Sequence, residues 1–196
     1  TDDKEGEEDN FIYALGDKRC ANFGTCATGF SGTALVNQEL LALFNRGKEQ
    51  ARSLDCEPID DIHEKIGTLM MLPFIQGTLR YLYYTKDTQG AKTTGELWAF
   101  ATAILPFVNE VNPAAAEALY KRAWLLDFSG SYEADKKLLE NTYSKFGVGA
   151  GKGSITCEKI GDLYSDPLNM LSENTCSSSP RSDDDDGLAL SSPLSG

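Results

Sequence analysis

The stretch from Ile66 to Thr85, IGTLMMLPFIQGTLRYLYYT, is the most apolar part of this 196-residue chain, and Arg80 is its one charged residue. A helix that is apolar on almost every side is a buried one. The glycines, Gln76 and Arg80 within the run suit a protein interior better than a lipid-facing surface, so we expect no membrane insertion. Pro73 lacks a backbone N–H donor, and we therefore expect the helix to kink or split near Leu72.

Helical periodicity continues on both sides of this run, and no strand pattern stands out. Apolar residues recur at helical spacing, and we expect further helices over residues 35–54, 93–111, 113–128, 132–147 and 154–164. Asn112 followed by Pro113 is typical of a helix start, and Ser131 is a second N-cap candidate. The sequence predicts an all-α fold, a compact bundle of five to six helices.

The two ends of the chain differ in composition from the body. Residues 1–10 carry six acidic residues and one lysine, and residues 172–196 are rich in serine and contain the run Asp183 to Asp186. Such text buries too little apolar surface to offset chain entropy. We expect disordered acidic tails at 1–10 and 172–196 and a single helical domain at 11–171. Most of the net charge of -12 lies in the tails, where DDDD is interpreted as a solubilising run rather than a cation or partner site.

The overall charge and the cysteines restrict the class of protein. An acidic chain repels phosphates, so nucleic-acid binding is not expected. Five cysteines without a C-x-x-C pair do not match a zinc signature. We expect two disulfides and one leftover thiol, which indicates an oxidising compartment. Four cysteines allow three pairings, and we favour Cys20–Cys26 with Cys56–Cys157, leaving Cys176. Because the chain starts at Thr1, we also expect a processed or trimmed protein.

Two charges within the apolar helices need partners. Arg80 is the one charged residue between Lys65 and Lys86, and Glu96 the one between Lys92 and Glu110. An unpaired ion in a core is costly. If residues 86–92 close an antiparallel hairpin, Arg80 and Glu96 lie at the same height and face each other, with Gln76 on the same inner face. This buried polar cluster is either a structural salt bridge or a ligand or ion site lined by Glu96.

The chain's one histidine lies in the segment IDDIHEKIG, residues 59–67. Asp60, His63 and Glu64 fall within one helical turn, and with Glu96 they form a mixed nitrogen and oxygen donor set that suits iron. The alternative is an ordinary helix start, where acidic residues are favoured by the helix dipole. HEKIG lacks the second histidine of a zinc protease.

No catalytic set of side chains can be assembled from the sequence. GVGAGKG, residues 147–153, lacks the spacing of a phosphate-binding loop, and we read it as a flexible turn. Nothing resembles a nucleophile with a base and an orienting group. We therefore expect a protein that is not an enzyme.

Three stretches resemble one known family. YALGDKRCANFGTC, FIQGTLRYLYYTKD and GELWAFATAILPFV are similar to segments of the algal low-iron-inducible periplasmic proteins, also called high-carbon-dioxide-inducible extracellular iron-assimilation proteins. The resemblance covers about residues 11–165. A weaker likeness to imelysin-like iron-uptake proteins lacks that family's metal motif, because Arg80 and Gly77 stand where an acid and a histidine are expected.

The resemblance implies a secreted or periplasmic helical protein of a photosynthetic microbe. Its expected function is to bind or concentrate iron at the cell surface without catalysis, with iron ions and a cell-surface receptor as partners. The alternative function is that of a structural or accessory subunit that docks on a larger assembly at the cell surface or in a chloroplast lumenal compartment.

Overall fold

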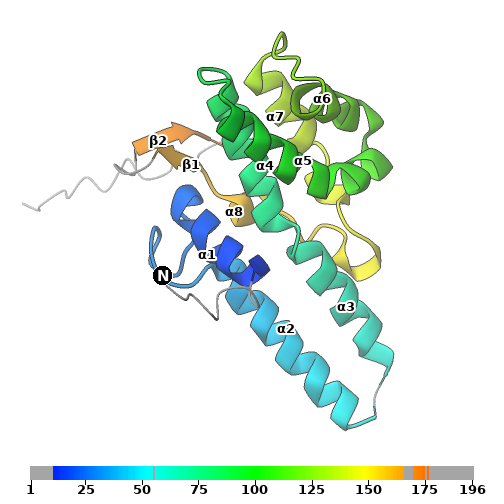
Figure 1. Cartoon of the computed structure of the whole chain (residues 1–196). Helices are drawn as coiled ribbons and strands as arrows, with labels where there is room; N and C mark the ends of the chain where they lie inside the picture. The colour runs from blue at the N-terminus through cyan, green and yellow to red at the C-terminus, as the bar shows by residue number, and fades with distance from the viewer. Residues whose placement is uncertain (1–10, 55, 166–169, 175, 177–196) are drawn as a thin grey trace, which may run out of the picture.

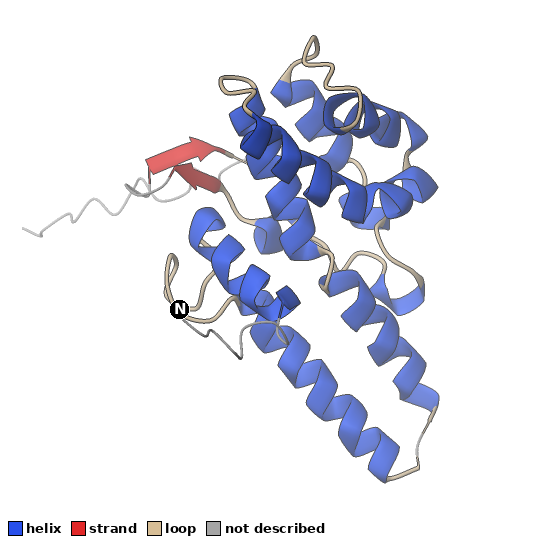
Figure 2. Cartoon of the chain, viewed as in Figure 1, coloured by secondary structure: helices blue, strands red, loops and turns tan. Residues whose placement is uncertain are grey.

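The computed structural model describes residues 11–54, 56–165, 170–174 and 176, and these residues are mainly helical (Figures 1 and 2). The predicted helical fold class is confirmed. The eight α-helices of the described residues are α1 (Phe11–Phe23), α2 (Leu35–Arg52), α3 (Glu57–Leu69), α4 (Leu72–Thr85), α5 (Ala91–Val111), α6 (Pro113–Ala123), α7 (Tyr132–Glu140) and α8 (Cys157–Ile160).

The apolar stretch from Ile66 to Thr85 is divided between two helices. α3 ends at Leu69 and α4 begins at Leu72, with Pro73 in the first turn of α4. The predicted split is therefore confirmed. Proline is tolerated in the first turn of a helix, because the backbone N–H that it lacks would have no intrahelical partner there. α4 contacts α1, α5, α7 and α8. Its buried side chains, which include Ile75 and Leu79, form the centre of the hydrophobic core.

The helices form two groups, which Figure 1 separates clearly. α2 and α3 run side by side as a long hairpin, and α4 to α7 pack at the other end of the molecule. α1 lies against both α2 and α4 and so joins the two groups. The α3–α4 junction at residues 70–71 is therefore the place where the chain passes from one group to the other.

Two predicted helix starts are confirmed by their hydrogen bonds. The Asn112 side chain accepts a bond from the backbone N–H of Ala115 at 3.2 Å, and Pro113 occupies the first turn of α6. The Ser131 hydroxyl accepts a bond from the N–H of Ala134 at 3.1 Å. Each cap satisfies a backbone donor that would otherwise lack a partner.

Other expectations about the helices are wrong in detail. α1 was not among the helices predicted from the sequence. The predicted helix 154–164 is in fact the short α8, which stops because Gly161 adopts a left-handed φ of 74°. The chain then forms a two-stranded antiparallel sheet that was not expected, made of β1 (Leu163–Ser165) and β2 (Met170–Glu173).

The folded body extends beyond the predicted boundary at residue 171. β2 runs on to Glu173, and Cys176 is bonded to Cys157. Of the predicted tails at 1–10 and 172–196, residues 1–10, 175 and 177–196 lie outside the described residues. Within the described part of the chain, no helix has the length and apolarity required to cross a membrane.

One predicted disulfide is confirmed and the other is wrong. Cys20 and Cys26 are bonded, but Cys157 pairs with Cys176, and Cys56 is an exposed free thiol. Cys56 lies at the start of α3, where the α2–α3 hairpin turns. In Figure 1 this end of the hairpin is the end that is farther from α8. The β1–β2 hairpin instead turns the chain back, which brings Cys176 to α8. Two disulfides are compatible with a secreted or extracellular protein.

Candidate functional site

The three stretches that carry the family resemblance meet on one aromatic ring. Arg19 of α1 lies over the ring of Phe100 of α5, with 5.6 Å between the guanidinium carbon and the ring centroid. Tyr81 of α4 stacks on the same ring, with centroids 5.6 Å apart and an interplanar angle of 11°. Gly77 provides the space for this ring on α4. Residues far apart in sequence therefore form one α1–α4–α5 cluster.

Arg19 is the most buried charge of this cluster, with a relative exposure of 3%. Its Nε and Nη1 atoms have no hydrogen-bond partner. Burial lowers the pKa of the Arg19 guanidinium, and the charge of Arg80 lowers it further, whereas Tyr81 and the charge of Glu96 raise it. Glu96 thus helps to offset the repulsion between two neighbouring arginines.

The predicted polar cluster is thereby extended by a residue that the sequence analysis missed. Arg80 and Glu96 both act on Arg19, and the guanidinium of Arg80 lies 4.8 Å from the ring centroid of Tyr84. A direct pairing of Arg80 with Glu96 stays a prediction. The sequence signal for Arg19 was weak, because arginine beside Lys18 in a charged segment is typical of a surface.

Gln76 is buried as predicted, with an exposure of 1%. Its amide donates to the carbonyl of Ile160 at 2.8 Å and to the hydroxyl of Thr25 at 3.2 Å. It therefore ties α4 to the end of α8 and to the loop after α1. Its role is to join distant segments of the chain.

The candidate iron ligands are divided between α3 and α5. Asp60 and His63 are exposed on α3, and Glu96 is a half-buried residue of α5. Glu64 accepts a hydrogen bond from the backbone N–H of Ala150 at 2.8 Å. Among the residues that the structure describes, no three His, Cys, Asp or Glu side chains come together to hold a metal ion.

Glu64 holds the glycine-rich segment 147–153 against α3. The short 3-10 helix η3 (Gly149–Gly151) packs on α3. Gly149 has a φ of 45°, and a Cβ atom there would lie 2.1 Å from Oε2 of Glu64. A side chain at this position would displace the carboxylate. The segment that we read as a flexible turn is therefore a fixed wall beside α3.

A group of exposed aromatic side chains covers part of α5 and α6. We call Trp98, Tyr120 and Trp124 the aromatic surface. Their exposed fractions are 45%, 41% and 47%. The rings of Tyr120 and Trp124 stack with centroids 5.9 Å apart, and Trp98 lies 5.4 Å from Trp124. The three rings contact one another but stay partly exposed, so together they leave apolar surface open to solvent.

The aromatic surface continues into a groove and an apolar loop. A groove of about 410 Å³ next to Tyr120 is lined by Leu105, Pro106, Asn109, Pro113, Ala116, Glu117 and Tyr120. On the other side of Trp124, Leu125 and Leu126 are more than half exposed. The exposed apolar area thus reaches beyond the three rings.

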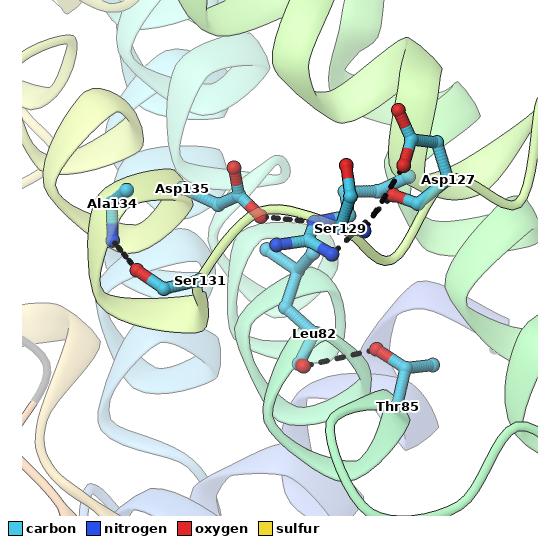
Figure 3. A network of polar contacts seen from close by, with 8 residues as sticks. Leu82, Thr85, Asp127, Ser129, Ser131, Ala134 and Asp135 are labelled. Carbon is cyan, nitrogen blue, oxygen red and sulfur yellow. Dashed lines mark hydrogen bonds and ion pairs between the residues drawn. The ribbon is translucent and has the colours of Figure 1, made fainter.

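A polar network fixes the loop that follows Trp124 (Figure 3). Arg122 of α6 forms a buried ion pair with Asp135 of α7. Arg122 also donates to the carbonyl of Asp127 at 3.3 Å, and the Asp127 carboxylate accepts the N–H of Ser129 at 3.0 Å. Burial raises the pKa of Asp135, although the Arg122 guanidinium acts in the opposite direction. The network holds the loop between α6 and α7, which begins at Trp124.

Comparisons of the chain with protein-family models, curated proteins and solved structures give no match. The function is therefore argued from the residues of this chain.

Proposed function

We propose that this protein is a non-catalytic subunit of an oxidising, extracytoplasmic compartment that docks on a larger cell-surface assembly through its aromatic surface. The observation that carries the proposal is the exposure of Trp98, Tyr120 and Trp124 as one group of contacting rings. Tryptophan and tyrosine are over-represented among the residues that dominate binding energy at interfaces. The two disulfides support the choice of compartment.

The way in which the aromatic surface is held supports a docking role. Binding loses less entropy when the contact residues are already ordered. Trp124 stacks on Tyr120 and also contacts the tilted ring of Trp98. The loop after Trp124 is held by Arg122, which bonds to Asp127 and Asp135. A protein partner can therefore pack against the ordered aromatic surface and into the neighbouring groove with little rearrangement of this chain.

Site-specific photocrosslinking tests the proposal. A benzophenone amino acid replaces Tyr120 in one variant and Phe44 of α2 in another, since both are exposed aromatic residues with 41% and 55% exposure. Each variant is exposed to an intact cell-surface fraction and irradiated. We expect one discrete adduct from position 120 and none of the same mass from position 44. Equal labelling from both positions, or none from either, would reject docking through this surface.

Intrinsic fluorescence gives an independent measurement, because Trp98 and Trp124 are the two tryptophans of the chain. The purified partner of the adduct should shift their emission to shorter wavelength as the rings lose contact with water. Trp124→Ser should weaken this association at least tenfold, whereas Phe44→Ser should leave it unchanged. An unshifted emission at saturating partner would show that the rings stay exposed in the complex.

A second candidate function is iron assimilation, in which the protein binds or concentrates iron at the cell surface. It is favoured by the resemblance, since the three stretches that carry it meet around Phe100 instead of lying scattered over the fold. Asp60, His63, Glu64 and Glu96 are the candidate ligands. Glu64 accepts the N–H of Ala150 through Oε2, so Oε1 is the oxygen that would bind the iron ion.

Calorimetric titration with ferrous and ferric iron separates this candidate from docking. Asp60→Asn and His63→Ala should each weaken iron binding at least tenfold, and Asp61→Asn is the matched control with the same charge change on the same turn. Binding no tighter than micromolar, about -8 kcal/mol, would reject iron as a ligand. If Asp61→Asn weakened iron binding equally, the effect of Asp60→Asn would come from the lost negative charge and not from ligation of the iron by Asp60.

A further inference from the structure

The α2–α3 hairpin extends away from α4 to α7 (Figure 1), and one side of α2 is exposed along it. Leu41, Phe44 and Lys48 follow one another at helical spacing on this side, and all three residues are exposed. The two apolar residues are each more than half exposed. Two large apolar side chains thus lie in solvent on a helix that the aromatic surface does not use.

A stripe of α3 faces the same way. The two helices meet where Gly47 of α2 lies against Ile62 of α3, with 3.5 Å between a Cβ atom at residue 47 and Cγ2 of Ile62. Lys48 and His63 each come one residue after this contact. Because the two helices of the hairpin are antiparallel, a step of about 100° along each of them turns the side chain to the same side of the hairpin.

The α3 stripe has an open place. Asp60 and Gly67 share the stripe of His63, and all three residues are exposed. A Cβ atom at Gly67 would meet nothing within 4 Å, and Met70 and Met71 line an apolar hollow beside it. We call the two stripes together the hairpin face, which consists of Leu41, Phe44, Lys48, Asp60, His63 and Gly67.

The two helices carry opposite charge near the turn that connects them. Residues 45–52 of α2 contain three bases and one acid, a sum of +2, and residues 57–61 of α3 contain three acids and no base, a sum of -3. On the hairpin face these charges are Lys48 and Asp60. Neither side chain forms an ion pair or a hydrogen bond with the residues that the structure describes. Both charges are therefore available to a partner.

A face with a basic side and an acidic side is complementary to a second copy of itself. In a two-fold contact the same surface meets from both copies. If the axis runs along the hairpin, α2 of one copy lies over α3 of the other. Gly47 and Ile62 lie at the same height, so Lys48 is level with residue 61 and comes next to Asp60 of the second copy. This match occurs twice in the pair, and it selects a second copy as the occupant of the face.

The same arrangement covers the apolar side chains. Phe44 is level with residue 65, so its ring comes between His63 and Gly67 of the second copy, over the open place on α3. We infer that two copies of the chain pair through the hairpin face, with Lys48 of each copy bound to Asp60 of the other and the Phe44 rings packed over α3. The contact uses no residue of the aromatic surface, so the docking proposal does not depend on it.

Sedimentation velocity of the full chain measures the pairing. The free thiol of Cys56 is alkylated first, so that no disulfide joins two copies, and a chelator keeps iron from bridging them. We expect a reversible change from one copy to two between low micromolar and near-millimolar concentration. The pairing should weaken as salt is added, because salt screens exposed ion pairs. A chain that stays monomeric over this range would overturn the inference.

Charge reversal tests the register of the two copies. Lys48→Glu and Asp60→Lys should each weaken the pairing at least tenfold, because each places like charges opposite each other twice in the pair. An equal mixture of the two variants should pair about as tightly as the native chain, since one native Lys48–Asp60 pair and one reversed pair then form. A mixture that stays monomeric, or single variants that pair like the native chain, would overturn the assignment.

Two further variants separate the contact from general charge. Asp61→Lys makes the same charge change one residue away from Asp60 and off the hairpin face, and should leave the pairing unchanged. Equal weakening by Asp61→Lys would overturn the placement of Asp60 in the contact. Phe44→Ser should weaken the pairing at least tenfold without loss of helical signal, because the ring is exposed. Unchanged pairing of Phe44→Ser would overturn the packing of the ring over α3.

The pairing and the docking proposal fail separately. A benzophenone at position 44 should join two copies of the chain, and the mass of that adduct is twice the mass of the chain. An adduct of another mass at position 44 would contradict a second copy as the occupant. Loss of docking at position 120 would leave the sedimentation result unchanged, because the two experiments probe different helices.

Discussion

Gly77 of α4 lies directly against the ring of Phe100 of α5, so that a Cβ atom at residue 77 would be 2.4 Å from Cδ1 of that ring. The two helices can approach this closely because residue 77 has no side chain. Arg19 of α1 and Tyr81 of α4 then cover the ring. The glycine in the QGTLRY stretch is therefore explained by helix packing around Phe100.

Gly77→Ala should lower the free energy of unfolding by about 1 to 3 kcal/mol, because the added methyl forces Phe100 or a helix to move. Urea denaturation measures the loss. Gly95→Ala is the control, since no atom lies within 4 Å of its Cβ position, and it should gain up to about 1 kcal/mol from helix propensity. Adding Phe100→Leu to Gly77→Ala should cost less than the sum of the single changes. Full additivity would contradict the packing explanation.

The charges around Phe100 lead to a second prediction. Arg19→Met should leave the free energy of unfolding within about 1 kcal/mol, because methionine keeps the contact with the ring and removes a buried guanidinium that is repelled by Arg80. Glu96→Gln should cost about 1 to 2 kcal/mol, since it leaves the two arginines without this compensating charge.

The two changes should be coupled. In the Arg19→Met background, Glu96→Gln should cost clearly less than in the native chain, and urea denaturation of the four proteins gives the coupling energy. Glu117→Gln is an exposed control that should show no coupling to Arg19. Zero coupling at Glu96 would remove it from the cluster.

Local rules in the sequence were sufficient to predict much of the helical fold. The division at Pro73 and the caps at Asn112 and Ser131 each depend on a few neighbouring residues, and the structure confirms all three. The burial of Gln76 followed from its place on an apolar helix. Such features need no knowledge of the tertiary fold.

Features that depend on distant segments could not be predicted in this way. The polar composition after residue 171 indicated a tail, yet Cys176 closes a disulfide with Cys157 there. Arg19 was missed because its burial is produced by α4 and α5. Glu64 was predicted from its own helical turn, and its hydrogen bond from Ala150 depends on a segment 86 residues further along the chain. In each case the deciding partner lies far away in the sequence.

The observed disulfide pairing predicts how strongly replacement of each cysteine lowers the free energy of unfolding. Replacing Cys157 and Cys176 by serine should cost about 3 kcal/mol and replacing Cys20 and Cys26 about 2 kcal/mol, because the loss of loop entropy grows with the 19- and 6-residue separations. Cys56→Ser should have no effect, since this thiol is exposed and unbonded. Thermal unfolding ranks the variants.

Peptide mapping checks the pairing itself. Without reduction, an alkylating reagent should modify Cys56 alone among the five cysteines. A Cys56–Cys157 peptide would contradict the structure.

Two buried tyrosines should control alkaline unfolding. The hydroxyls of Tyr132 and Tyr143 are buried and have no hydrogen-bond partner. Burial raises the pKa of Tyr143 well above the ordinary 10.0, and burial followed by the charges of Glu173 and Glu140 also raises the pKa of Tyr132. Above pH 10 the unfolded chain therefore releases protons that the folded protein keeps. The stability contribution is complete below that pH and is lost as the pH rises past it.

Tyr143→Phe should therefore move the alkaline unfolding midpoint, followed by circular dichroism, to higher pH. At neutral pH the same change should be neutral or slightly stabilising, because it removes a buried hydroxyl without a partner. Tyr13→Phe is the control, since the Tyr13 side chain is exposed. Absorbance at 295 nm should show the Tyr143 phenolate only as the helical signal disappears. Ionisation of Tyr143 in the folded protein, or an unshifted midpoint in Tyr143→Phe, would contradict the assignment of this residue as the buried group that limits stability at high pH.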